Sequence, residues 1–159
     1  MTNEEYMRYC ISLAEKSVDA DEWPFACIIV KNGEIIAESI NGVHKHMDIA
    51  SHAEILAMKE AQKVLNTHDL SDCEIFSNCE PCAMCSLIIR ALKFKKVVFS
   101  LPSPYMGGYT KWTILQDTKL EELKSDFNNP PEVIAGLLQE EAVKTFKRIR
   151  WGEMLEPIV

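Results

Sequence analysis

Three residues with affinity for zinc occur in this chain at spacings that suit one metal site. His52 is followed two positions later by Glu54, and Cys82 and Cys85 come further along as a C-x-x-C pair. One imidazole and two thiolates are common zinc ligands, and three protein ligands leave the fourth tetrahedral position open. Zinc with an open position lowers the pKa of a water bound there to about 7. The set therefore predicts hydrolytic chemistry with Zn²⁺ as the cofactor.

Glu54 is the residue that we predict to move protons in this chemistry. A carboxylate that lies beside a metal without binding it can act as a general base and then as a general acid. A structural role competes with this one, because Ser51-x-x-Glu54 also fits a capping box. The downstream C-x-x-C pair favours catalysis. We therefore predict His52, Cys82 and Cys85 as metal ligands and Glu54 as the catalytic residue.

Both metal-site segments are predicted to begin a helix. Ser51 is expected to be the N-cap of a helix that extends to about Leu65, and Pro81 suits the first turn of a helix that ends near Leu92. Cys82 and Cys85 are three positions apart and share one helix face. The positive end of the helix dipole lowers thiol pKa values. Two such helix starts could hold a cation through ionised thiolates.

The remaining pattern predicts the fold class. Apolar spacing predicts a helix over 4–18, and dense apolar runs predict strands over 23–31, 34–40, 72–77 and 95–100, with a hairpin turn at Asn32-Gly33. Residues 41–50 and 101–108 are expected to be loops. A short helix is expected over 120–124 and a longer one over 131–150. Alternating strands and helices predict an α/β fold, a three-layer α/β/α sandwich whose mixed sheet has an antiparallel first hairpin and then parallel strands.

Length and composition limit the other possibilities. The chain has 159 residues, of which 47% are hydrophobic and 26% charged, so we expect a single domain over residues 1–159. No apolar run approaches a membrane span and the N-terminus has no apolar signal region, which predicts a cytoplasmic protein with reduced thiols. The net charge of −7 disfavours a nucleic-acid partner, although it leaves room for a local basic patch.

Two motifs resemble those of a known family. Residues 51–54 (Ser-His-Ala-Glu) and 78–85 (Asn-Cys-Glu-Pro-Cys-Ala-Met-Cys) resemble the cytidine-deaminase-like zinc superfamily, nearest its guanine deaminase and tRNA adenosine deaminase branch. Residues 24–33 are similar to the first hairpin of the family, which leads to Asn41. The resemblance covers roughly residues 1–100. It implies a cytidine deaminase-like fold, hydrolytic deamination, a homodimer, and hydrogen bonds from Asn41 to a nucleobase edge.

The substrate is less constrained than the reaction. We expect a small nucleobase or nucleoside, with guanine as the first candidate. The alternative substrates are adenosine in a tRNA loop and a cytosine-type pyrimidine. A further alternative is that the chain is a non-catalytic, zinc-stabilised interaction domain. Phe25 is a possible base-stacking wall, although a core position is favoured for it, and the aromatic residues after Ser100 could close over a planar ring. The substrate contacts that we expect are Phe25, Asn41, Ala53, Tyr105 and Trp112.

Other arrangements of the metal-binding residue types remain open from the sequence. Cys82 and Cys85 could be a redox pair, or part of an iron–sulfur run that begins at Cys79. Cys79 could also be the fourth ligand of a closed structural zinc site. His44 and His46 form an H-x-H pair in the loop before the motif, where solvated histidines are the more common case.

Overall fold

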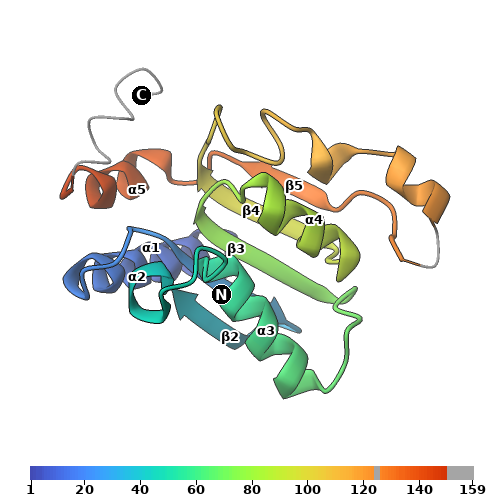
Figure 1. Ribbon diagram of the computed structural model, residues 1–159, viewed down its shortest axis with the longest axis horizontal. Helices are drawn as coiled ribbons and strands as arrows, with labels where there is room; N and C mark the ends of the chain where they lie inside the picture. The colour runs from blue at the N-terminus through green and yellow to red at the C-terminus, as the bar shows by residue number, and fades with distance from the viewer. Residues whose placement is uncertain (124–125, 150–159) are drawn as a thin grey trace.

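One mixed β-sheet organises the protein, and its strand order is β2-β1-β3-β4-β5 (Figure 1). The computed structural model describes residues 1–123 and 126–149. β1 (Ala26–Lys31) pairs antiparallel with both β2 (Glu34–Ile40) and β3 (Cys73–Cys79). β4 (Lys96–Leu101) and β5 (Glu132–Ala135) extend the sheet with parallel pairing. The predicted mixed sheet with an antiparallel first hairpin is confirmed.

Helices cover both faces of this sheet and complete the three predicted layers. α1 (Asn3–Asp19) packs on one face, and α5 (Gln139–Phe146) lies beside α1 and against β4. α3 (Ala53–Leu65) and α4 (Ala83–Ala91) lie together on the other face (Figure 1). Among the helices of the described ranges, none is long and apolar enough to cross a membrane.

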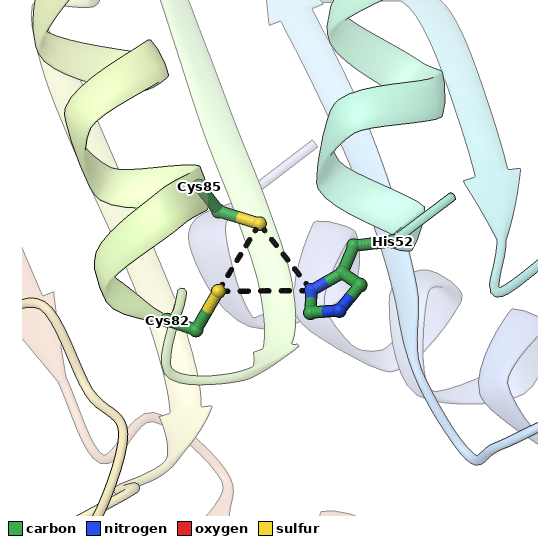
Figure 2. A group of neighbouring side chains, drawn as sticks. All are labelled: His52, Cys82 and Cys85. Carbon is green, nitrogen blue, oxygen red and sulfur yellow. Dashed lines mark hydrogen bonds between the residues drawn. The ribbon is translucent and has the colours of Figure 1, made fainter. Parts of the chain in front are cut away.

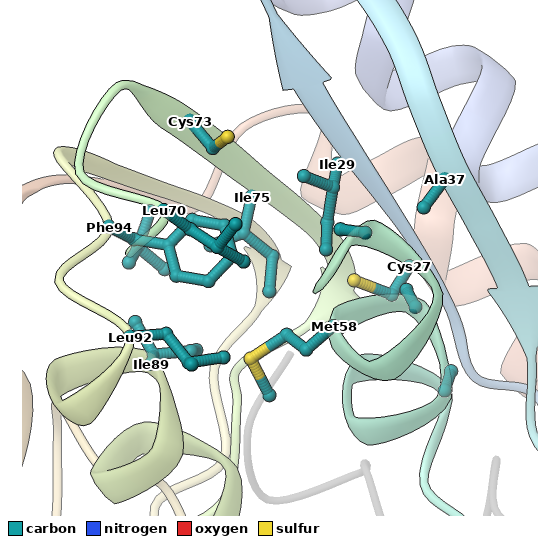
Figure 3. Packing of buried hydrophobic residues seen from close by; sticks show 14 of the residues in the cluster. Cys27, Ile29, Ala37, Met58, Leu70, Cys73, Ile75, Ile89, Leu92 and Phe94 are labelled. Carbon is teal, nitrogen blue, oxygen red and sulfur yellow. The ribbon is translucent and has the colours of Figure 1, made fainter. Parts of the chain in front are cut away.

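The alternation of side chains along β1 explains why the sheet has a core on each face. Ile28 and Val30 point toward α1, whereas Cys27 and Ile29 point toward α3 and α4 (Figure 3). Successive residues of a strand face opposite sides, so a strand buried on both faces must be apolar throughout. The dense apolar run in this part of the sequence is a consequence of that double burial.

The C-terminal segment contradicts the sequence prediction. The helix expected over 131–150 is replaced by strand β5 and the shorter helix α5, and its last residue, Arg150, lies outside the described residues. Val133 and Ile134 are β-branched and pair with Val97 and Val98 of β4. Gly136 then adopts a φ of 79°, which ends the strand. The prediction failed because the open edge of β4 supplies hydrogen bonds that local helical spacing does not reveal.

Short helices occupy the connecting segments. α2 (Val43–His46) lies within the loop expected over 41–50. Two 3-10 turns follow β4, η1 (Ile114–Gln116) and η2 (Lys119–Leu123), and the second confirms the short helix expected near 120. Arg90, on α4, is buried and donates hydrogen bonds to the carbonyl oxygens of Ile114, Asp117 and Asn128. This guanidinium holds the connecting segment against α4.

Candidate metal centre and active site

The predicted metal ligands occupy the starts of two helices. His52 is the N-cap of α3 and Cys82 is the N-cap of α4, with ψ angles of 148° and 172°, and neither side chain makes a capping hydrogen bond. An N-cap side chain usually accepts a hydrogen bond from an amide of the first helical turn. Here both N-cap side chains leave their helices and point toward one another (Figure 2).

Ser51 was predicted as the N-cap of α3, and this prediction is wrong by one residue. Its hydroxyl donates to Oδ2 of Asp48 at 3.0 Å and lies 3.1 Å from Nδ1 of His46. Its carbonyl oxygen accepts a hydrogen bond from the N–H of Gly42 at 3.0 Å. Because Ser51 belongs to the preceding loop, the capping box with Glu54 is not formed, and the Glu54 carboxyl remains for another role.

The ligand atoms of His52, Cys82 and Cys85 form an equilateral triangle (Figure 2). The distances from His52 Nδ1 to each Sγ, and between the two Sγ atoms, are all 3.6 Å. Zn–S bonds of about 2.3 Å and Zn–N bonds of about 2.0–2.1 Å place neighbouring atoms of a tetrahedral site about 3.5 to 3.8 Å apart. The residues therefore fit zinc. Within residues 1–123 and 126–149, no other group of three or more His, Cys, Asp or Glu side chains has its ligand atoms close enough together to hold a metal ion.

Electrostatics favour a cation at this triangle. The hydrogen bond with Cys85 is the main reason that the pKa of Cys82 falls to about 4, and the contact with His52 lowers it further. The hydrogen bond to Cys82 in turn raises the pKa of His52. The same contact, together with burial, raises the pKa of Cys85. Cys82 is thus a thiolate at neutral pH, which is the form that binds metals.

Glu54 lies two residues after His52 in the first turn of α3, and only 6% of it is exposed. Burial, and then the negative charge of Cys82, raise the pKa of Glu54 to about 7. A carboxyl group with a pKa near neutrality can both accept and release a proton at neutral pH. Glu54 is not a member of the ligand triangle. Its placement suits proton transfer beside a metal.

Glu80 is a buried glutamate, not predicted as a site residue, that holds the loop after β4 close to the start of α4. Glu80 is 3% exposed, and its carboxylate accepts hydrogen bonds from the backbone N–H groups of Ser103, Tyr109 and Thr110 at 2.7 to 2.9 Å. The hydroxyl of Thr110 donates to it as well, at 2.9 Å. The loop over 103–110 is also joined to the start of α4, because the Ala83 N–H donates to the Met106 carbonyl oxygen at 3.0 Å. Glu80 therefore fixes this loop beside Cys82.

The predicted substrate residues differ in how close the structure places them to the metal ligands. Asn41 directly follows β2 and is 2% exposed. The N–H of the next residue, Gly42, donates to the carbonyl oxygen of Ser51, which precedes His52. Ala53 is buried directly after His52. Phe25 packs edge-on against Phe146 of α5, with ring centroids 5.5 Å apart, as a core residue does.

The two loop aromatics are exposed. Tyr105 is 68% and Trp112 is 55% exposed, and Lys111 Nζ lies 5.7 Å from the centre of the Trp112 ring. Neither side chain is packed into the core clusters. Their contact with substrate stays a prediction.

The alternative ligand sets are not assembled in the described part of the chain. Cys79, His44 and His46 are not in the cluster of ligand atoms, and the six cysteines are free thiols. The pKa of Cys79 is raised by burial, unlike that of Cys82.

A cavity of about 550 Å³ is formed by residues that precede β3, β4 and β5, such as Ser71, Lys95 and Pro131, and none of the predicted site residues lines it.

Glu22 is a second buried acid, and no sequence pattern indicated it as a site residue. It is 6% exposed and bonds to Asn41, although it lies 19 positions earlier in the chain. Glu80 could have been found from its place in the Glu-Pro-Cys motif. Glu22 had no comparable signal, because a single acid before an apolar strand is more often a solvated residue.

Comparison with protein families gives one match for the first two thirds of the chain. Residues 1–101 match the family described as the cytidine and deoxycytidylate deaminase zinc-binding region. This range contains the ligand triangle, Glu54 and Asn41. It ends at the last residue of β4, so the loop over 103–110 and everything after it lie outside the match.

Individual relatives include proteins that act on different substrates. A tRNA-specific adenosine deaminase of Aquifex aeolicus is 35% identical over 151 residues, which cover 94% of this chain and 97% of the relative. A guanine deaminase of Bacillus subtilis is 42% identical over 101 residues, covering 63% of this chain and 65% of the relative. A solved guanine deaminase structure from Nitrosomonas europaea superposes with a TM-score of 0.75 at 26% identity, covering 96% of this chain and 85% of that one.

Proposed function

The chain belongs to the cytidine and deoxycytidylate deaminase zinc-binding family, and we propose that it removes an amino group from a purine ring by hydrolysis. The family resemblance drawn from the two sequence motifs is confirmed, as is the prediction of zinc as the cofactor. The reaction replaces a ring C–NH₂ by C=O and consumes one water for each ammonia released. The observation that carries the proposal is the zinc-sized triangle beside a buried, non-ligating Glu54.

His52, Cys82 and Cys85 would hold the zinc ion. When bound, zinc supplies a Lewis acid that makes water a nucleophile at neutral pH. Glu54 would take a proton from the attacking water and return protons to the ring nitrogen and to the departing amine. Burial supports both transfers, because it holds the pKa of Glu54 near 7.

Guanine as a free base is the first candidate substrate. The net charge of −7 gives the chain little general affinity for phosphates. Three lysines lie within residues 93–96, and two of them, Lys95 and Lys96, are paired with Glu74 at 3.2 and 2.8 Å. The relatives do not favour guanine over a tRNA nucleoside, so the charge argument is what supports the smaller substrate.

Adenosine in tRNA is the second candidate, and a specific observation favours it. A relative that is 35% identical over 94% of this chain and 97% of its own length is a tRNA-specific adenosine deaminase, whereas the 42% identity to the Bacillus subtilis guanine deaminase covers 63% of this chain. Binding to tRNA would need a basic surface on an acidic protein, and such binding weakens steeply as salt increases.

Ammonia release is the experiment that separates these candidates. The zinc-loaded protein would be given guanine, adenosine, cytosine and a tRNA anticodon stem-loop that contains adenosine. We expect release from guanine and no inosine in the stem-loop. Inosine formation without reaction on guanine would reverse this assignment, and no release from any of them would indicate a non-catalytic zinc domain.

We also propose that two copies of the chain associate through the start of α4 and the loop beside it. Met84 and Leu87 of α4 are 40% and 47% exposed, and Tyr105 and Met106 of the loop are 68% and 55% exposed. Exposed apolar side chains grouped in this way commonly mark an interface. Leu87→Lys should convert a dimer to a monomer in analytical ultracentrifugation. Val64→Lys, at an exposed position near the far end of α3, is the matched control.

A further inference from the structure

Asn41 carries a buried hydrogen-bond acceptor with no partner. The residue is 2% exposed, and its Oδ1 bonds to no group within the described ranges. Its N–H donates to the Phe25 carbonyl oxygen at 2.9 Å, so the backbone position is fixed. A buried acceptor that lacks a donor costs about 1–3 kcal/mol. Such an atom next to an active site is explained if a ligand supplies the missing donor.

Glu22 determines which way the Asn41 amide points. Its Oε2 accepts from Asn41 Nδ2 at 2.9 Å and from the His44 N–H at 3.2 Å, and its Oε1 accepts from the Lys45 N–H at 2.7 Å. Burial alone would raise the pKa of Glu22, but these hydrogen bonds outweigh it and hold the pKa below its ordinary value. The carboxylate is therefore ionised at neutral pH.

An ionised carboxylate has acceptors only, so it can face the Nδ2 side of the Asn41 amide and not the Oδ1 side. The reverse orientation would place two acceptors against each other and leave both amide hydrogens without this partner. With Nδ2 held by Glu22, Oδ1 must lie on the opposite side of the amide. The side chain of Asn41 is thus an oriented acceptor, and it cannot rotate to donate without giving up its bond to Glu22.

We propose that Glu22 is a positioning residue that presents Oδ1 of Asn41 to the substrate, so that the group recognised there must be an N–H or O–H donor. This inference rests on the proposed deaminase function. A free purine base offers ring N–H donors. In adenosine all the ring nitrogens except the glycosidic one are acceptors, so only the amine and the ribose hydroxyls could meet this atom.

A double-mutant cycle tests whether Glu22 acts through Asn41. The variants are Glu22→Gln, Asn41→Ala and the double substitution, with guanine as substrate and 8-azaguanine as the binding probe. Glutamine keeps the shape of Glu22, but it can turn either an oxygen or an NH₂ toward Asn41, so the amide orientation is no longer enforced. Glu74→Gln is the control, because it removes a partly buried carboxylate from the start of β3, away from the metal ligands.

We expect each single variant to raise KM for guanine and Kd for 8-azaguanine about tenfold, with kcat changed by less than about twofold. The double variant should be no worse than Asn41→Ala alone, because Glu22 has no remaining route to the substrate. Glu74→Gln should leave both constants unchanged. A double variant that weakens binding about a hundredfold would mean independent effects and would overturn the positioning role. So would a Glu22→Gln variant that binds as the wild type does.

A further variant covers a failure of Glu22→Gln to fold. Asn41→Asp places a second carboxylate opposite Glu22 and removes the Nδ2 donor, so binding of 8-azaguanine should weaken at least as much as in Asn41→Ala. Wild-type affinity in Asn41→Asp would refute an oriented acceptor. If the wild type neither binds 8-azaguanine nor deaminates guanine, the free-base assignment has failed, and the same cycle with the tRNA stem-loop decides the inference on Glu22.

Discussion

A Cβ atom added to Gly107 would lie 2.0 Å from Oε1 of Glu80. The carboxylate occupies the space that a side chain at 107 would need, and it does so because the N–H groups of Ser103, Tyr109 and Thr110 surround it. The loop over 103–110 is therefore built around one buried side chain that lies beside the start of α4.

Gly107→Ala should destabilise the protein by about 1–3 kcal/mol, since the added methyl group forces either the loop or Glu80 to move. Urea denaturation measures the change. The same substitution in a Glu80→Ala background should cost less, because the obstructing carboxylate is gone. Equal costs in the two backgrounds would show that the contact with Glu80 is not what excludes a side chain at 107.

Glu54→Gln should retain zinc and lower kcat by about 10²–10⁴, the usual contribution of a general acid–base group. Ammonia release gives the rate, and metal analysis of the same preparation gives the zinc content. Glu60→Gln, an exposed glutamate of the same helix with 53% of its side chain accessible, serves as the control and should behave as the wild type. Near-normal turnover in Glu54→Gln would exclude a proton-transfer role.

Cys82→Ala should abolish zinc binding, because two ligands cannot complete the triangle and the thiolate with a pKa of about 4 is lost. Cys79→Ala is the matched control, since this thiol lies three residues earlier and outside the ligand cluster. Mass spectrometry under native conditions measures the zinc content of both variants. Zinc retained in Cys82→Ala, or lost in Cys79→Ala, would contradict the assignment of ligands.

The stabilising effect of Glu22 should depend on pH. Its pKa in the folded protein is below the ordinary value of 4.5, so its contribution is complete above about pH 4.5 and is lost as the pH falls through the folded pKa. The free energy of unfolding should be higher for the wild type than for Glu22→Gln, and this difference should be larger at about pH 7 than at about pH 3. Denaturation at both values measures this difference, and a gap that widens in acid would contradict an ionised Glu22.

The grouping of His52, Cys82 and Cys85 could be predicted from the sequence because two short motifs carry these residues. His52 and Glu54 are separated by one residue, and Cys82 and Cys85 share a helix turn, so local spacing defines most of the geometry. The antiparallel first hairpin and the parallel pairing of β3 with β4 also followed from the alternation of strands and helices. These features depend on neighbours in the chain, which a single sequence displays.

The features that the sequence did not reveal depend on distant contacts. β5 is a strand because β4 offers it a partner, whereas its own residues were equally compatible with the start of a helix. Glu22 and Glu80 are buried where backbone amide groups from segments later in the chain, at Lys45 of α2 and at Tyr109 of the loop after β4, converge on them. No periodicity marks an acid that is buried in this way.

Because one ligand comes from the start of α3 and two come from the start of α4, a bound metal ion would also stabilise the fold. An ion held by His52, Cys82 and Cys85 joins two helices that share only limited direct packing, much as a covalent staple would. Ligands that bind only the native state stabilise it in proportion to the logarithm of their concentration. The melting temperature should therefore rise with added zinc, and a chelator should loosen the α3–α4 layer before it affects the layer formed by α1.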